Sequence, residues 1–302
     1  MQLRERFRGC LLGLAVGDAV GTTVEFRPRG TFPSVTDMIG GGPFQLLPGQ
    51  WTDDTSMALC LASSLVEREG FDAHDQMDRY SRWHHEGYLS STGVCFDIGG
   101  TVASALHYYQ QTGDPYAGST NPMSAGNGCI MRLAPISMFF YTDLDAIEQY
   151  AAESSRTTHG AQECVDACRL FGRIICRALL GRPKDEAVFG DYGRFRGAPR
   201  IVAIAQGAWL GKDEAEIHGS GYVVDSLEAA LWCFMHTETF EDAILRAANL
   251  GDDADTTAAV CGQLAGAYYG ESAIPSSWLE RLTMRREITR LADRLAMRYE
   301  AV

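Results

Sequence analysis

Two clusters of acidic and hydroxyl side chains stand far apart in this sequence, and both could bind metal. The first is Thr52-Asp53-Asp54-Thr55, and the second is Asp252-Asp253-Ala254-Asp255-Thr256. Neighbouring carboxylates repel each other and destabilise a fold unless a cation or hydrogen-bond donors neutralise them. The clusters offer hard oxygen ligands without His or Cys, which suits Mg²⁺, Mn²⁺ or Ca²⁺ better than zinc or copper. If the fold brings the clusters together, they form a carboxylate-rich site, with scope for two metal ions.

Helix capping is the alternative explanation for these clusters. Asp, Ser and Thr are favoured N-caps, acidic residues suit the first helical turn, and each cluster runs into an apolar, helix-like stretch. One cluster alone would more often be a cap than a metal site. Two clusters, each with two or three carboxylates within four residues, favour metal binding. Neither has the spacing of an EF-hand loop.

The composition is that of a folded globular protein with an acidic surface. The chain has 302 residues, of which 46% are hydrophobic and 22% are charged, and its formal net charge is −13. It has no run of Lys or Arg, so the sequence argues against a nucleic-acid partner and against anionic membranes. A small anionic ligand is still compatible with it, because metal ions, single arginines and helix N-termini bind anions locally.

The nine cysteines and the N-terminal residues indicate the compartment. The number of cysteines is odd, most stand among apolar residues, and there is no Cys-x-x-Cys pair, so buried free thiols in a reducing compartment are expected. The first apolar stretch is short and contains Asp18, which is not typical of a signal peptide. No segment is expected to span a membrane. The sequence therefore predicts a cytoplasmic protein.

Apolar residues recur at three- and four-residue spacings along most of the chain, which predicts an all-α fold in one compact multi-helix domain, residues 1–302. Asp72 and Ser276 are the expected N-caps of two helices. The Gly- and Pro-rich segment 27–48 and the segment 182–199 are expected to be irregular. The expected helices are 3–17, 55–69, 74–86, 99–112, 143–154, 160–180, 200–210, 223–235, 239–249, 255–269 and 277–299.

The order of several short motifs is more informative than any one of them. They are Gly9 to Gly21 leading to Glu25-Phe26, Trp51 to Thr55, Phe96-Asp97-Ile98-Gly99, Gly126 to Arg132, Thr158-His159-Gly160 and Gly251 to Thr256. Together this series resembles the ADP-ribosylglycohydrolase family from about residue 5 to about residue 295. The Phe-Asp-Ile-Gly element is most similar to the branch of the family that acts on dinitrogenase reductase.

The resemblance implies a cleft holding two Mg²⁺ or Mn²⁺ ions, and hydrolysis of the N-glycosidic bond between ADP-ribose and a protein side chain, usually arginine. The partners implied are an ADP-ribosylated protein substrate and the product ADP-ribose. By motif, the metal ligands would be Thr52, Asp53, Asp54, Asp253, Asp255 and Thr256. Asp252 stands where many relatives have glycine, so it is left out of the ligand set.

The resemblance also implies acid and base residues and a nucleotide-binding surface. Glu25 and Asp97 match the acidic positions that would activate water or protonate the guanidine leaving group. The residues expected near bound ADP-ribose are Gly99, Gly100, Asn127, Gly128, His159 and Tyr222. Backbone N–H groups around these glycines would hold the diphosphate without adding positive charge.

Each of these residues has a simpler structural role as its alternative. Glu25 would pair with Arg27 or Arg29, and Asp97 would cap the helix expected near Gly99. His159 would be a hydrogen-bonding residue at a helix start, and Tyr222 a core aromatic with a satisfied hydroxyl.

Three other functions fit the same motifs. The first is hydrolysis of another ADP-ribose conjugate, such as serine-linked or small-molecule ADP-ribose. The second is two-metal phosphoester chemistry, and the third is a catalytically silent ADP-ribose binder. The complete carboxylate sets argue against the silent binder, because degenerate relatives are expected to lose some of them.

Overall fold

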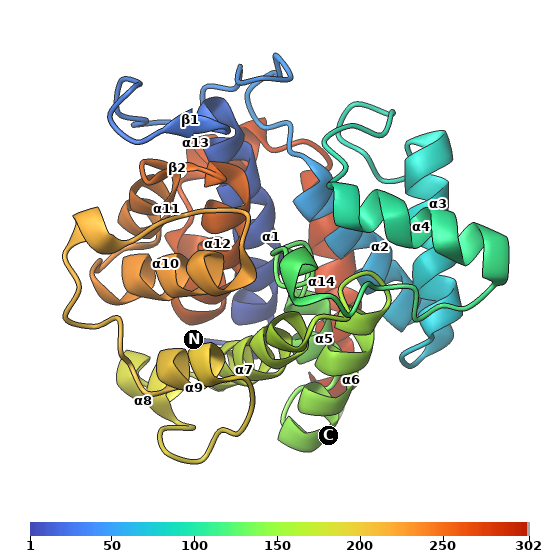
Figure 1. Ribbon diagram of the computed structural model, residues 1–302. Helices are drawn as coiled ribbons and strands as arrows, with labels where there is room; N and C mark the ends of the chain where they lie inside the picture. Colours follow the sequence, from blue (N-terminus) through green and yellow to red (C-terminus); the bar gives the residue numbers. More distant parts are fainter. Residues whose placement is uncertain (301–302) are drawn as a thin grey trace.

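A computed structural model describes residues 1–300, in which helices surround one long buried helix (Figure 1). This helix is α1, and every residue from Gly9 to Gly21 in it is buried. A helix that is apolar on all sides belongs in a protein core. The α-helices are α1 (Leu3–Gly21), α2 (Asp53–Arg68), α3 (Ala73–Glu86), α4 (Gly100–Thr112), α5 (Ala134–Phe139), α6 (Leu144–Arg156), α7 (Gln162–Leu179), α8 (Lys184–Phe189), α9 (Pro199–Ala205), α10 (Val223–Met235), α11 (Phe240–Ala248), α12 (Ala254–Tyr269), α13 (Ser276–Arg281) and α14 (Arg285–Glu300). Short 3₁₀ turns are η1 (Thr22–Val24), η2 (Pro122–Ser124), η3 (Glu214–Glu216) and η4 (Glu271–Ala273).

Helices α1 and α12 are in contact backbone to backbone along most of their length. A Cβ atom added at Gly17 would lie 2.1 Å from the carbonyl oxygen of Ala258, and one added at Gly13 would lie 2.4 Å from that of Gly262. Small residues at every fourth position make this possible, because positions i and i+4 lie on the same helix face. The small residues are Gly9, Gly13, Gly17 and Gly21 in α1, and Ala254, Ala258, Gly262 and Gly266 in α12.

The other helices pack on this central pair directly or through a neighbouring helix (Figure 1). Helices α10 and α11 pack on α12, and α14 packs on both α1 and α2, so the first and last helices share one core. Helix α7 packs on α6, and α2 packs on α3 and α5. A short antiparallel ladder of β1 (Arg27–Pro28) and β2 (Gly251–Asp252) pairs Arg27 with Asp252. The expected all-helical fold is therefore confirmed; β structure among residues 1–300 is limited to this two-residue ladder and three isolated bridges.

Some details of the expected helices were wrong. Helices α5 and α8 were not expected, and α8 lies inside the segment 182–199 that was predicted to be irregular. The expected helix 277–299 is two helices, because Met284 adopts a left-handed backbone conformation (φ 55°) between α13 and α14. Asp72 is confirmed as an N-cap that accepts from the N–H of Asp75, whereas Ser276 is not one, because Pro275 occupies that position.

The N-terminal helix bears on the expectation that no segment spans a membrane. The segment Leu3–Val24 is long and apolar enough to cross a membrane by length and composition, and 89% of the apolar window is buried inside the protein. This burial is that of a core helix. Eight of the nine cysteines are buried, Cys95 is half-buried, and all nine are free thiols.

The tight contact of α1 with α12 gives the first prediction. We expect Gly17→Ala to lower the free energy of unfolding by about 1–3 kcal/mol, because the new methyl group overlaps backbone atoms that cannot move independently. Gly70→Ala is the matched control, since a Cβ atom there meets no atom within 4 Å. Chemical denaturation measures both variants, and equal stability of the two would contradict the prediction.

Candidate functional site

The fold brings the two acidic clusters together at the N-termini of α2 and α12. The hydroxyl of Thr52 donates to Asp255 Oδ2 at 3.2 Å, and the hydroxyl of Thr256 donates to Asp54 Oδ2 at 3.2 Å. Thr52 and Asp253 are the N-cap residues of these helices, and neither side chain makes a capping hydrogen bond. Capping therefore does not explain why both clusters are acidic.

Asp18 supplies the cap that α2 lacks, and the sequence did not single it out as a site residue. Its Oδ1 accepts from the backbone N–H of Thr52 at 2.9 Å, and its Oδ2 accepts from that of Thr55 at 3.0 Å. The hydroxyl of Thr55 also donates to Asp18, and the hydroxyl of Thr52 shares its single proton between Asp18 and Asp255. Because Asp18 of α1 neutralises the start of α2, the carboxylates of Asp53 and Asp54 are left for other contacts. A single charge within an apolar helix was the available signal.

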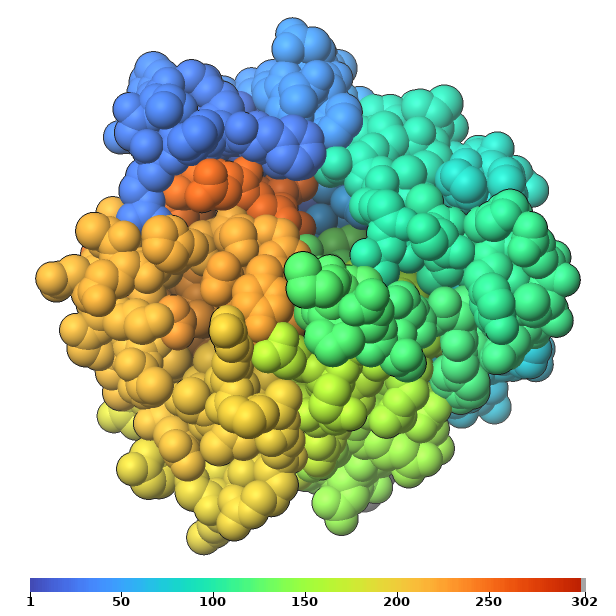
Figure 2. Space-filling model, in the orientation of Figure 1, coloured from blue at the N-terminus to red at the C-terminus, as the bar shows by residue number. Residues whose placement is uncertain are grey.

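A cavity of about 350 Å³ lies over the meeting point of the clusters. Figure 2 shows the molecular surface hollowed where N-terminal (blue), C-terminal (orange) and teal segments meet. None of the described residues that line the cavity is a lysine or an arginine. The lining residues are Glu25, Phe26, Asp53, Asp97, Ile98, Gly99, Gly100, Thr101, Val102, Gly126, Asn127, Gly128, Met131, His159, Gly221, Asp253, Asp255 and Thr256. Thr52 and Asp54 are fully buried and lie outside this lining.

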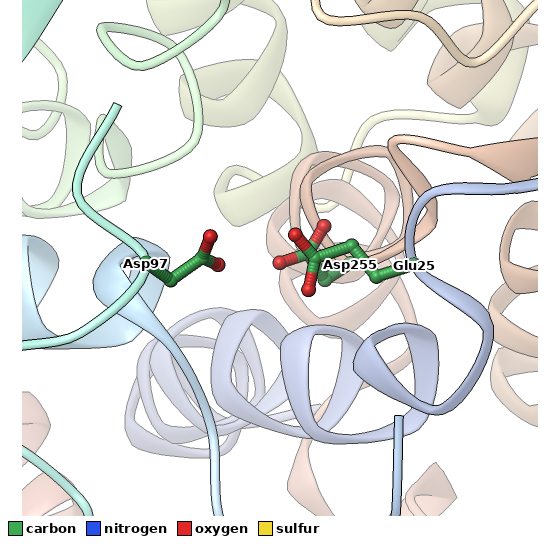
Figure 3. A group of neighbouring side chains, drawn as sticks. All are labelled: Glu25, Asp97 and Asp255. Atoms are coloured by element: carbon green, nitrogen blue, oxygen red, sulfur yellow. The ribbon is translucent and has the colours of Figure 1, made fainter. Parts of the chain in front are cut away.

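Three carboxylates from different parts of the chain converge in this cavity. Glu25 follows η1, Asp97 lies in the loop before α4, and Asp255 lies in the first turn of α12. Each offers an oxygen atom that lies within 4.8 Å of those of the other two. Figure 3 shows the carboxylate of Asp97 pointing toward those of Glu25 and Asp255. Such a group can hold a metal ion.

Burial and mutual repulsion make these carboxylates hard to ionise. Burial, with the nearby charges of Asp97 and Asp253, raises the pKa of Glu25 to about 9. Burial and the charge of Asp18 raise the pKa of Asp97 to about 7. The pKa values of Asp53, Asp54 and Asp255 are likewise raised well above the usual range, chiefly by burial. Neutralisation by protons or by cations is therefore required.

The donor set fits a hard divalent cation. Asp54 Oδ1 and Asp255 Oδ1 are buried without a hydrogen-bond partner among the described residues. A buried carboxylate oxygen without a donor destabilises the fold, whereas a bound cation would satisfy it. All candidate ligands are carboxylate or hydroxyl oxygens, the preference of Mg²⁺, Mn²⁺ and Ca²⁺.

The glycine-rich segments and His159 form the other wall of the cavity. Gly99 is the N-cap residue of α4 and has no side chain to accept a hydrogen bond. The N–H groups in the first turn of α4 therefore receive no side-chain capping bond from it. His159 lies beneath the Gly126–Gly128 turn, where a Cβ atom at Gly128 would lie 2.8 Å from the ring. Its Nδ1 is 2.9 Å from the hydroxyl of Thr158, and burial lowers its pKa to about 4. The imidazole is therefore neutral near pH 7.

Asn127 and Tyr222 have different positions relative to the cavity. The amide of Asn127 donates to Asp253 Oδ2 at 2.9 Å, so it holds one carboxylate of the second cluster. Tyr222 is half-buried and donates its hydroxyl to Glu163. It lines an adjoining cavity of about 660 Å³ that shares Thr101, Gly126 and Gly221 with the first.

The simpler roles of Glu25 and Asp97 are not observed. Within residues 1–300 no ion pair joins Glu25 to Arg27 or Arg29; Arg27 donates to the carbonyl of Thr31 and Arg29 to that of Leu250. Asp97 does not cap α4. Its backbone is left-handed (φ 57°), a conformation that aspartate tolerates better than most residues and that aims its side chain into the cavity.

Comparisons with known proteins show which proteins this chain is similar to. A model of the ADP-ribosylglycohydrolase family matches residues 1–302. The chain is 46% identical over 294 residues to "ADP-ribosylarginine hydrolase Tri1" of Pseudomonas putida (strain GB-1), covering 97% of this chain and 78% of that protein. It is 35% identical to "ADP-ribosyl-[dinitrogen reductase] glycohydrolase" of Rhodospirillum rubrum, covering 97% and 96%. A solved structure, "ADP-ribosylglycohydrolase-related protein complex", superimposes with a TM-score of 0.87 at 45% identity, covering 98% of each chain.

The raised pKa values predict how the metal-free protein responds to pH. A carboxyl whose pKa is higher in the folded than in the unfolded chain gives stability at low pH that is lost as pH rises. Glu25, Asp97 and Asp18, with pKa values raised to about 9, 7 and 6, place this loss between about pH 4, where unfolded carboxyls ionise, and about pH 9. With a chelator, we expect Tm to fall across this range.

Divalent cations test the same prediction from the other side. Mn²⁺ or Mg²⁺ added at pH 8 should raise Tm, because cations replace protons as the neutralising charge. Scanning calorimetry with and without chelator measures both effects. A chelated protein whose Tm rises from pH 5 to pH 8 would show that the carboxylates are neutralised in another way.

Proposed function

Because the chain belongs to the ADP-ribosylglycohydrolase family, we propose that it is a metal-dependent hydrolase of the N-glycosidic bond between ADP-ribose and a protein arginine. One observation carries the proposal. Two oxygen-rich clusters from opposite ends of the chain meet in one cavity, with Glu25 and Asp97 beside them. The similarity to proteins named for hydrolysis of ADP-ribosylarginine supports arginine as the linked side chain.

Two Mg²⁺ or Mn²⁺ ions are the cofactors that we propose. Their ligands would be Thr52, Asp53 and Asp54 of the first cluster, and Asp253, Asp255 and Thr256 of the second. The partnerless oxygens of Asp54 and Asp255 support this assignment. When bound, such ions orient ribose hydroxyls and lower the pKa of a bound water.

Glu25 and Asp97 are the residues to which we assign proton transfer. Hydrolysis breaks the bond between the anomeric carbon and a guanidine nitrogen; water supplies the new hydroxyl, and the nitrogen takes up a proton. One carboxylate accepts the proton from water, and the other carboxyl donates one to the departing nitrogen. A buried carboxyl with a raised pKa, such as Glu25, is suited to donate a proton, and one whose pKa is raised to about 7, such as Asp97, is suited to either role.

The ADP-ribose would lie along the glycine-rich wall. The uncapped N-terminus of α4 at Gly99 and Gly100 offers backbone N–H groups to the diphosphate. Asn127, Gly128 and the neutral His159 would line the ribose and phosphate path. Tyr222, in the adjoining cavity, would contact the part of the nucleotide farther from the metal ions.

We further propose that the protein acts in the cytoplasm, on an ADP-ribosylated protein substrate, in keeping with its nine free cysteines. One candidate substrate is dinitrogen reductase, which would give the protein a role in regulating nitrogen fixation. The 35% identity to a glycohydrolase named for dinitrogen reductase supports this candidate. The 46% identity to a hydrolase named only for ADP-ribosylarginine supports a different arginine-modified target equally well.

The deciding experiment compares substrates, metals and products. ADP-ribosylated arginine and serine peptides are incubated with Mn²⁺, Mg²⁺ or chelator, and the products are identified by mass spectrometry. We expect metal-dependent release of free ADP-ribose from the arginine peptide. Release from serine alone would identify a different conjugate, and AMP would identify phosphoester chemistry. ADP-ribose binding without any release would identify a silent binder.

Removing a metal ligand should separate metal binding from folding. We expect Asp255→Ala to abolish metal binding and activity, because a proposed ligand is lost. The helices should remain folded, because the substitution removes one repelling carboxylate from a buried cluster. Calorimetric titration with Mn²⁺ and circular dichroism measure the two properties. An unfolded Asp255→Ala variant would instead indicate a purely structural cluster.

Removing a proton-transfer residue should slow turnover without stripping the metal. Glu25→Gln keeps the shape of the side chain but cannot exchange a proton, so we expect kcat to fall by about 10²–10⁴-fold. Asp97→Ala should behave in the same way. Metal titration beside steady-state kinetics tests this, and wild-type kcat in both variants would refute the assignment.

A further inference from the structure

Three phenylalanines form an aromatic rim (Phe26, Phe44 and Phe96) beside the carboxylates. Phe26 directly follows Glu25, and Phe96 directly precedes Asp97. Phe44 joins them: its ring centroid lies 6.5 Å from that of Phe26 and 5.2 Å from that of Phe96. The rim therefore links the two chain segments that carry the proposed proton-transfer residues. Of the three, Phe26 lines the cavity itself.

The loop that carries Phe44 is fixed against the site. Gly42 adopts a left-handed conformation (φ 66°), and a Cβ atom there would lie 2.0 Å from the carbonyl oxygen of Thr22. Only glycine permits this approach. The hydroxyl of Thr22 in turn donates to Glu25 at 3.4 Å. The pairing of Gly41 with Leu46 closes the turn around Phe44. The position of the rim is thus tied to that of the carboxylates.

Phe26 is held in an unfavourable state on two counts. Its backbone is left-handed (φ 61°), which is rare for a bulky residue, and its side chain is 65% exposed. The N–H of Phe26 donates to the carbonyl of Asp252 at 2.7 Å, next to the β1–β2 ladder, so the strained residue is anchored to the segment that carries the second acidic cluster. Strain of this kind, with no burial of the ring in return, is typical of a residue that contacts a ligand.

We propose that Phe26, supported by Phe44, receives the guanidinium group of the substrate arginine, an inference that rests on the proposed function. A guanidinium is a planar, weakly hydrated cation that stacks on aromatic faces. The cavity beside Phe26 has carboxylates and no lysine or arginine among the described lining residues, so a cationic group is favoured there. A serine linkage has no such cation. Phe26 is therefore a specificity-determining residue, and Phe44 is a positioning residue.

Steady-state kinetics of rim variants on an ADP-ribosylated arginine peptide tests the inference. We expect Phe26→Ala to raise KM by about 2- to 30-fold, with a smaller change in kcat. Phe26→Trp should have a KM close to that of the wild type, because tryptophan keeps an aromatic face. Phe26→Leu should have a raised KM, because leucine is apolar but has no π face. Phe44→Ala should raise KM less than Phe26→Ala. Leu47→Ala is the matched control, since Leu47 is 68% exposed on the same loop and outside the cavity.

Inhibition by free ADP-ribose separates contact with the guanidinium from contact with the nucleotide. The Ki of ADP-ribose should be the same in the wild type and in Phe26→Ala, because ADP-ribose lacks the guanidine. A parallel rise in Ki, or a wild-type KM in Phe26→Leu or Phe26→Ala, would overturn the inference alone. A wild-type protein that releases no ADP-ribose from the arginine peptide would refute the proposed function, and this inference with it.

Discussion

The backbone contact between α1 and α12 is the constraint on which the rest of the structure depends. Glycine and alanine at every fourth position let the two helices approach until carbonyl oxygens lie where side chains would otherwise be. That approach brings Asp18 near the end of α1 to the level of Asp253 and Asp255 at the start of α12. Bulkier residues along this contact would separate the helices and move the carboxylates apart.

Burial and mutual repulsion of the carboxylates in the acidic site destabilise the fold. Burial raises the pKa of Glu25 to about 9 and of Asp97 to about 7, and two carboxylate oxygens, on Asp54 and Asp255, have no partner among residues 1–300. Natural folds tolerate such local destabilisation where a site needs it and compensate through packing elsewhere. Here the compensation lies in the extensive apolar core around α1 and in the four hydrogen bonds that Asp18 accepts.

Left-handed backbone conformations recur around the mouth of the cavity. Phe26, Asp97 and Asp252 all have positive φ angles, and each lies next to a residue or motif of the site. Sharp turns at these points let side chains from three distant segments face one another within a small volume. The same turns place the aromatic rim next to the carboxylates, so the residues proposed to receive the substrate side chain and those proposed to transfer protons are held by one set of turns.

The sequence by itself determined the helical fold, the two oxygen-rich clusters and the family, because apolar periodicity and short motifs are local properties of the chain. Short helices such as α5 and α8 were missed, since six residues carry too little periodicity. Only the tertiary structure decided which carboxylates face one another, that Asp18 caps α2 and that Phe44 bridges Phe26 and Phe96. These contacts join residues that are distant in the chain. Their geometry depends on how closely two helices pack, and local sequence patterns do not predict that distance.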